Sequence, residues 1–134
     1  MEMRTVLFVD DDKLVLSSLK RGLIDEEYNK LFAESGQEAL SLLEKYEVNV
    51  IVSDMRMPEM DGLTLLKRVR EKYPTVVRMV LSGYTEINTL LTAINEGEIF
   101  RFITKPWQME EEFKPAVRQA LEFYNSREHS TVEK

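Results

Sequence analysis

The sequence predicts an α/β fold of the doubly wound kind, with a five-stranded parallel sheet and helices on both of its faces. Short apolar runs alternate along the chain with amphipathic segments of helical spacing, which is the pattern of successive βα units. The apolar runs are nearly continuous, as in strands buried on both faces. The 134 residues fit one domain of ordinary size, so we expect a (βα)5 unit around this sheet.

The first two βα units are predicted in the N-terminal third of the chain. Residues 6–9 form a short apolar run that ends at three successive acids, which indicates a buried strand. From Lys13 onward, leucines recur at helical spacing. A second strand is expected over residues 28–33. Ser35, followed three residues later by Glu38, resembles a capping box at the start of the second helix.

The third and fourth units follow in the middle of the chain. The third strand is expected over residues 48–53 and stops at Asp54, and a helix then ends before Pro74. The fourth strand is expected over residues 76–81. The next helix spans residues 85–96, with Gly97 as its C-cap.

The fifth unit contains a short, partly exposed strand over residues 100–103 and the last helix. Proline is tolerated in the first turn of a helix but not in its interior. Pro115 therefore predicts an irregular turn over residues 109–113 and a regular helix that starts close to Pro115 and ends near residue 125. We expect one domain over residues 1–125, with residues 126–134 as a polar tail or the start of a linker.

Composition and charge exclude several classes of function. The chain has no cysteine, so disulfides and thiolate metal sites are excluded. Its formal charge of −6 argues against direct binding to nucleic acid. The sequence offers neither an apolar run long enough to span a membrane nor a signal-peptide pattern, so we expect a cytoplasmic protein without membrane contact.

Polar residues cluster at the predicted strand ends. Asp10 and Asp11 follow the first strand, Asp54 the third, Ser82 the fourth and Lys105 the fifth. Ligands of open α/β sheets bind at this edge. Clustered carboxylates repel one another, and Mg²⁺, which prefers oxygen ligands, would relieve that repulsion. Together with the ammonium and the hydroxyl, such a site can stabilise a phosphoryl group during transfer.

Four segments carry a resemblance to a known family. They are residues 9–11, 53–62, 81–83 and 104–106, each at a strand end. With these segments in this order, the chain resembles the receiver domain family of two-component signalling over about residues 4–124. The resemblance implies the CheY-like, flavodoxin-like fold. It also implies a phosphoacceptor switch that catalyses only its own phosphorylation and slow dephosphorylation.

The resemblance implies a role for each matching residue. Asp54 is the phosphoacceptor and a ligand of Mg²⁺ or Mn²⁺. Asp11 is a direct metal ligand, Asp10 holds the metal through water, and the backbone carbonyl of Arg56 is a further ligand. Lys105 pairs with the acceptor and then with the phosphate, and the Lys105–Pro106 peptide bond is cis.

The resemblance also implies switch residues and partners. Ser82 reaches for the phosphoryl group, and Phe102 turns inward when the hydroxyl moves. A sensor histidine kinase or a phosphotransfer domain donates the phosphoryl group. An output domain or partner protein binds the face formed by the fourth helix, the fifth strand and the last helix. Trp107 is either ordinary core or an exposed anchor on that face.

Two further hypotheses concern phosphate loss and output. Arg56 and Tyr84 correspond to positions that flank the path of hydrolytic water, and neither offers a carboxylate or primary amide to orient it. We therefore expect slow self-hydrolysis. Residues 96–107 resemble receivers attached to HD-GYP-type phosphodiesterase domains.

Alternative functions remain open from the sequence. An aspartyl-nucleophile, metal-dependent phosphatase would use two acids spaced as Asp10 and Asp12 are, although an acid in the position of Asp12 more often caps a helix. Asp61 with Gly62 is expected to serve a turn. The other alternative is a binding module that works without phosphorylation, such as a degenerate receiver or a flavin binder.

Overall fold

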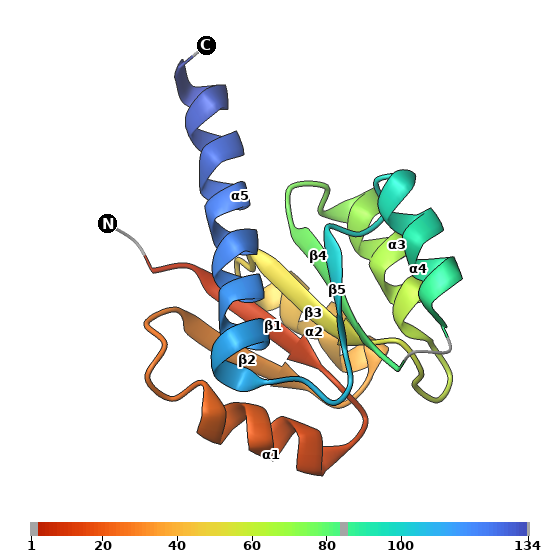
Figure 1. Ribbon diagram of the computed structural model, residues 1–134. Helices are drawn as coiled ribbons and strands as arrows, with labels where there is room; N and C mark the ends of the chain where they lie inside the picture. Colours follow the sequence, from red (N-terminus) through yellow and green to blue (C-terminus); the bar gives the residue numbers. More distant parts are fainter. Residues whose placement is uncertain (1–2, 84–85, 134) are drawn as a thin grey trace.

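The computed structural model describes residues 3–83 and 86–133, with side chains described as far as residue 127. These described residues form five strands and five α-helices in alternation (Figure 1). The strands are β1 (Thr5–Val9), β2 (Asn29–Ala33), β3 (Val50–Asp54), β4 (Val77–Ser82) and β5 (Arg101–Thr104). The helices are α1 (Lys13–Gly22), α2 (Gly36–Lys45), α3 (Gly62–Lys72), α4 (Ile87–Asn95) and α5 (Lys114–Glu133), with a π-helical turn, η2 (Met109–Phe113), before α5.

All neighbouring strands are parallel, in the order β2-β1-β3-β4-β5. The chain first moves outward from β1 to β2, then crosses back over β1 to β3 and continues to β5. This reversal places a topological switch point between β1 and β3, where doubly wound folds bind their ligands. The predicted fold class is confirmed.

The alternation of side chains along the strands creates two apolar cores. Val6 and Phe8 of β1 belong to the core under α1 and α5, whereas Leu7 and Val9 belong to the core under α2, α3 and α4. These strand residues are fully buried. The helices accordingly cover both faces of the sheet (Figure 1), which is why the strands read as continuous apolar runs. Among the described residues, no helix combines the length and apolarity that a membrane span requires.

Two site residues lie within strands rather than after them. Asp54 is the last residue of β3 and pairs with Leu81, and Ser82 is the last residue of β4 and pairs with Thr104. The sheet ladder continues beyond the apolar run, because backbone pairing does not require an apolar side chain. Hydrophobic patterning therefore ended both strands one residue too early.

The start of the predicted fourth helix lies outside the described residues at position 85. Its end agrees with the prediction, because Gly97 adopts φ +75° directly after the last turn of α4. This left-handed conformation is the usual way for a helix to end at glycine.

The predicted end of the last helix was wrong. The irregular turn is present as η2, and regular helix begins at Lys114, but α5 continues to Glu133. After Pro115 the sequence contains neither glycine nor proline to stop it. Arg127 also donates a hydrogen bond to the carbonyl oxygen of Thr75, at 2.6 Å. The last turns project past the sheet (Figure 1).

Candidate functional site

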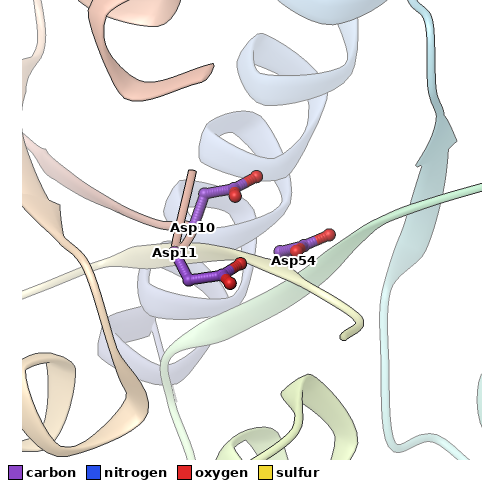
Figure 2. A group of neighbouring side chains, drawn as sticks. All are labelled: Asp10, Asp11 and Asp54. Atoms are coloured by element: carbon purple, nitrogen blue, oxygen red, sulfur yellow. The ribbon is translucent and has the colours of Figure 1, made fainter. Parts of the chain in front are cut away.

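Three carboxylates meet at the carboxyl edge of the sheet, next to the switch point. Figure 2 shows Asp10 and Asp11, which directly follow β1, beside Asp54 from β3. One oxygen from each of the three lies within 4.8 Å of the others. Asp10 and Asp54 are buried, whereas Asp11 is exposed. Because they combine oxygen ligands with a solvent-facing side, these residues could hold a metal ion.

Lys105 joins two of the three acids. Its Nζ lies 3.0 Å from Oδ2 of Asp10 and 2.9 Å from Oδ1 of Asp54. The residue directly follows β5, and its peptide bond to Pro106 is cis. Burial lowers the pKa of Lys105, but the hydrogen bonds to Asp54 and Asp10 outweigh that effect, so its pKa is raised overall. Lys105 is therefore a fixed positive charge in the site.

The surroundings of Asp54, unlike those of Lys105, disfavour its charged form. Its burial disfavours the charged carboxylate and raises its pKa. The hydrogen bond from Lys105 opposes this, while the charges of Asp10 and Asp11 add to it. One ammonium group thus faces three carboxylates, and the site retains excess negative charge that a divalent cation would neutralise.

Two acids close to the site in the sequence, Asp12 and Asp61, cap helices, whereas Asp10 belongs to the site. Asp10 accepts a hydrogen bond from the backbone N–H of Asp12 at 2.9 Å, which fixes its carboxylate. Asp12 itself accepts from the N–H of Leu14 and caps α1. Asp61 does the same for α3 through the N–H of Thr64. Asp12 is thus the helix cap that the sequence predicted, and Asp61 caps a helix where a turn was expected.

Gly62 allows the start of α3 to approach the backbone of Asp54. A Cβ at position 62 would lie 2.2 Å from the carbonyl oxygen of Asp54, far closer than atoms can approach. The N–H of Gly62 also donates to the carbonyl of Met55 at 2.8 Å. The sequence placed this glycine in a turn, and the close approach gives a second reason for the residue.

The two predicted switch residues lie on the neighbouring strands β4 and β5. Ser82 is buried at the end of β4, and its hydroxyl donates to the carbonyl oxygen of Gly83 at 3.0 Å. Phe102 of β5 is partly buried and packs against the core that α2, α3 and α4 cover. Tyr84 lies outside the described residues.

The structure also gives the contacts of Arg56 and Trp107. Arg56 forms an ion pair with Glu86, immediately before α4. No sequence signal pointed to Glu86, because the pairing depends on two loops that are 30 residues apart. Trp107 is partly buried against Phe113, with ring centroids 4.9 Å apart. It therefore contributes to the core while retaining some exposure.

Known proteins similar to this chain point to one family. The family model of the response regulator receiver domain matches residues 6–118. The hydrogenase transcriptional regulatory protein HoxA of Cupriavidus necator is 43% identical over 118 residues, which are 88% of this chain and 24% of that protein. The chain spans about a quarter of the length of such curated relatives.

Solved structures agree in fold. The signal receiver domain of an HD domain-containing protein from Pseudomonas fluorescens Pf-5 matches with a TM-score of 0.88 at 37% identity, covering 96% of this chain and 94% of that one. The chemotaxis protein CheY4 of Vibrio cholerae matches with a TM-score of 0.79 at 27% identity, covering 89% of this chain and 99% of that one.

Proposed function

The chain belongs to the response regulator receiver domain family, and on that premise we propose that Asp54 accepts a phosphoryl group in a Mg²⁺-dependent reaction. The observation that carries this proposal is the position of Lys105, which contacts Asp10 and Asp54 beside a third carboxylate. Receiver domains are phosphoacceptor switches rather than ordinary enzymes. The donor would be a histidine kinase or a phosphotransfer domain.

The proposed chemistry is an in-line displacement at phosphorus. A carboxylate oxygen of Asp54 attacks, a new O–P bond forms, and the P–N bond to the donor histidine breaks with its electron pair left on the imidazole nitrogen. Lys105 stabilises the charge that spreads over the phosphoryl oxygens. Mg²⁺ (or Mn²⁺), held by Asp11, Asp54 and the Arg56 carbonyl, with Asp10 acting through water, would neutralise further charge at the same place.

The proposed response is a shift between two conformations that the unphosphorylated chain already samples. Ser82 would move toward the phosphoryl group, and Phe102 would turn into the space that it leaves. The face formed by α4, β5 and α5 would then bind an output domain or partner, and the exposed part of Trp107 would contribute to that contact. The aspartyl phosphatase alternative loses support, because the Asp12 carboxylate caps α1.

We propose that the receiver domain spans residues 1–125 and that residues 126–134, in which α5 continues to Glu133, are a polar tail or the start of a linker. The similar receiver from Pseudomonas fluorescens is part of an HD domain-containing protein, which favours an HD-GYP-type output, whereas the likeness to HoxA favours a transcriptional output.

The cytoplasm is the proposed location of the protein. Because Arg56 and Tyr84 offer no group to orient water, phosphate loss should be slow, and Tyr84→Asn should accelerate it.

Intact mass tests the function. Incubation with a small acyl phosphate and Mg²⁺ should add one phosphoryl group, and Asp54→Ala should abolish the gain. Glu44→Ala, which alters an exposed carboxylate on α2, serves as the matched control and should label like the parent. If neither the acyl phosphate nor a cognate kinase labels the parent, the proposal is wrong.

A further inference from the structure

An ion pair connects the loop after β3 to the start of α4, at the edge of the acidic site. Nε of Arg56 lies 2.7 Å from Oε1 of Glu86, and Nη2 of the same guanidinium contacts that oxygen as well. Arg56 stands two residues after Asp54, and Glu86 is the N-cap residue of α4. The pair therefore links the loop that carries the phosphoacceptor to the helix of the proposed output face.

The two partners differ strongly in exposure. The side chain of Arg56 is 81% exposed, whereas that of Glu86 is only 14% exposed. A shielded carboxylate depends on a charged partner, because little water remains to solvate it. Within the described residues, Glu86 makes no capping hydrogen bond to its own helix. Its carboxylate therefore serves the contact with Arg56.

The other end of α4 is held differently. Arg78 of β4 donates to the carbonyl oxygen of Glu98 at 2.9 Å and to that of Gly97 at 3.2 Å. A further bond to the carbonyl of Val76, at 3.0 Å, fixes the same guanidinium to the sheet. Several hydrogen bonds to backbone thus hold the end of α4, whereas a side-chain pair holds its beginning.

We propose that the ion pair between Glu86 and Arg56 latches the first turn of α4 in the unphosphorylated protein. This inference rests on the proposed function. Phosphorylation replaces the singly charged carboxylate of Asp54 with an acyl phosphate that carries a charge of roughly −1.5 to −2, and the phosphoryl oxygens are strong acceptors that compete with Glu86 for the guanidinium. Release of the pair frees the first turn, and α4 pivots about the end that Arg78 holds.

Hydrogen exchange of the unphosphorylated full chain tests the latch itself. The amides of Leu90 and Leu91 close the first turn of α4 and report on its opening. Glu86→Gln and Arg56→Gln should each accelerate their exchange about twofold to fivefold, the range expected for a partly exposed ion pair. The double variant should be no faster than the faster single variant, because both remove the same contact.

The controls separate the latch from a general loss of stability. Glu44→Gln removes an exposed ion pair with Lys72 and should leave the exchange of Leu90 unchanged. Amides beyond residue 95, next to the carbonyls that Arg78 holds, should also keep the parent rate in every variant. Unchanged exchange at Leu90 and Leu91 in both single variants, or additive effects in the double variant, would overturn the latch.

A second measurement separates this inference from the proposed function. Phosphorylated parent protein should exchange Leu90 and Leu91 as fast as unphosphorylated Glu86→Gln does, and labelling of that variant should add little further. If the parent labels and its exchange at α4 does not change, the release step is wrong. If the parent takes no label from donor or kinase, the proposed function fails, whereas exchange in the unlabelled variants still decides the latch.

Discussion

At the scale of single residues, Gly62 shows how closely the backbone of the acceptor is packed. The nearest atoms to a Cβ at this position are the carbonyl oxygen of Asp54, at 2.2 Å, its carbonyl carbon, at 3.0 Å, and the Cα of Met55, at 3.1 Å. All three are backbone atoms, so no side-chain rotation could relieve the overlap. Any side chain here must push α3 away from β3.

We expect Gly62→Ala to lower the free energy of unfolding by about 1–3 kcal/mol, the usual cost of overpacking. Chemical denaturation with a constant m-value would measure it. Gly83→Ala is the matched control, because a Cβ there meets no atom of the described residues within 4 Å. Equal stability of the two variants would show that α3 can shift freely.

The residues of the acidic site could be predicted from the sequence, but their connections to the loops could not. Asp10, Asp54 and Lys105 stand at strand ends, and parallel strands bring those ends to one edge. The pairing of Arg56 with Glu86 depends instead on loop conformations, which no periodic pattern encodes. The sequence likewise does not show that the backbone at Gly62 approaches that of Asp54, because this contact depends on the position of α3.

At the scale of elements, a charged cluster ties the loop after α1 to η2 and α5. Lys114 is 4% exposed, and its Nζ lies 2.9 Å from Asp25 and 2.5 Å from Glu110. One turn later, Arg118 forms a two-bond pair with Glu26, at 2.9 and 2.7 Å. These contacts fix the start of α5 directly after the irregular turn.

This cluster should make stability depend on pH at both ends of the scale. The hydrogen bond from Lys114 lowers the pKa of Asp25, so its contribution is present above roughly pH 4 and is lost as the pH falls through the depressed pKa. Hydrogen bonds to Glu110 and Asp25 raise the pKa of Lys114. Its contribution is therefore complete below about pH 10 and is lost as the pH rises through the elevated pKa.

The difference in unfolding free energy between the parent and Lys114→Met should thus be largest between these limits and shrink outside them. Urea unfolding across the pH range would show this. Lys72→Met removes an exposed lysine whose pair with Glu44 is 3.6 Å long, and its effect should be small at every pH. A Lys114→Met effect that does not change with pH would assign the role of this lysine to packing.

The order of elements followed from hydrophobic periodicity, whereas several boundaries did not. Apolar runs located all five strands, yet Asp54 and Ser82 extend β3 and β4 by backbone pairing. The end of α5 was missed for a different reason. The sequence predicts a tail or linker over residues 126–134 because they are polar, but this segment contains no glycine or proline, and it remains helical while Arg127 donates a hydrogen bond to Thr75.

At the scale of the whole molecule, three carboxylates are concentrated at one edge of a chain whose net charge is −6. Asp10 and Asp54 are buried, and a single ammonium group, that of Lys105, contacts both. The carboxylates of the folded chain therefore repel one another, and a bound divalent cation would remove this repulsion. Folding and metal binding must then be thermodynamically linked.

Mg²⁺ should accordingly stabilise the folded chain, by about 2.7 kcal/mol at a concentration 100 times the dissociation constant. For a domain of this size the melting temperature should rise by roughly 10 °C.

Asp11→Asn should stabilise the metal-free protein, because it relieves repulsion, but it should weaken the stabilisation by Mg²⁺, because it removes a ligand. The metal-free variant should melt above the metal-free parent, while its response to Mg²⁺ should be smaller.

If Mg²⁺ acted only by screening the net charge, it would raise the melting temperatures of both proteins equally, and NaCl at the same ionic strength would have the same effect. Thermal melts of the two proteins with Mg²⁺, with NaCl and with neither salt therefore distinguish a specific site at Asp10, Asp11 and Asp54 from general electrostatics.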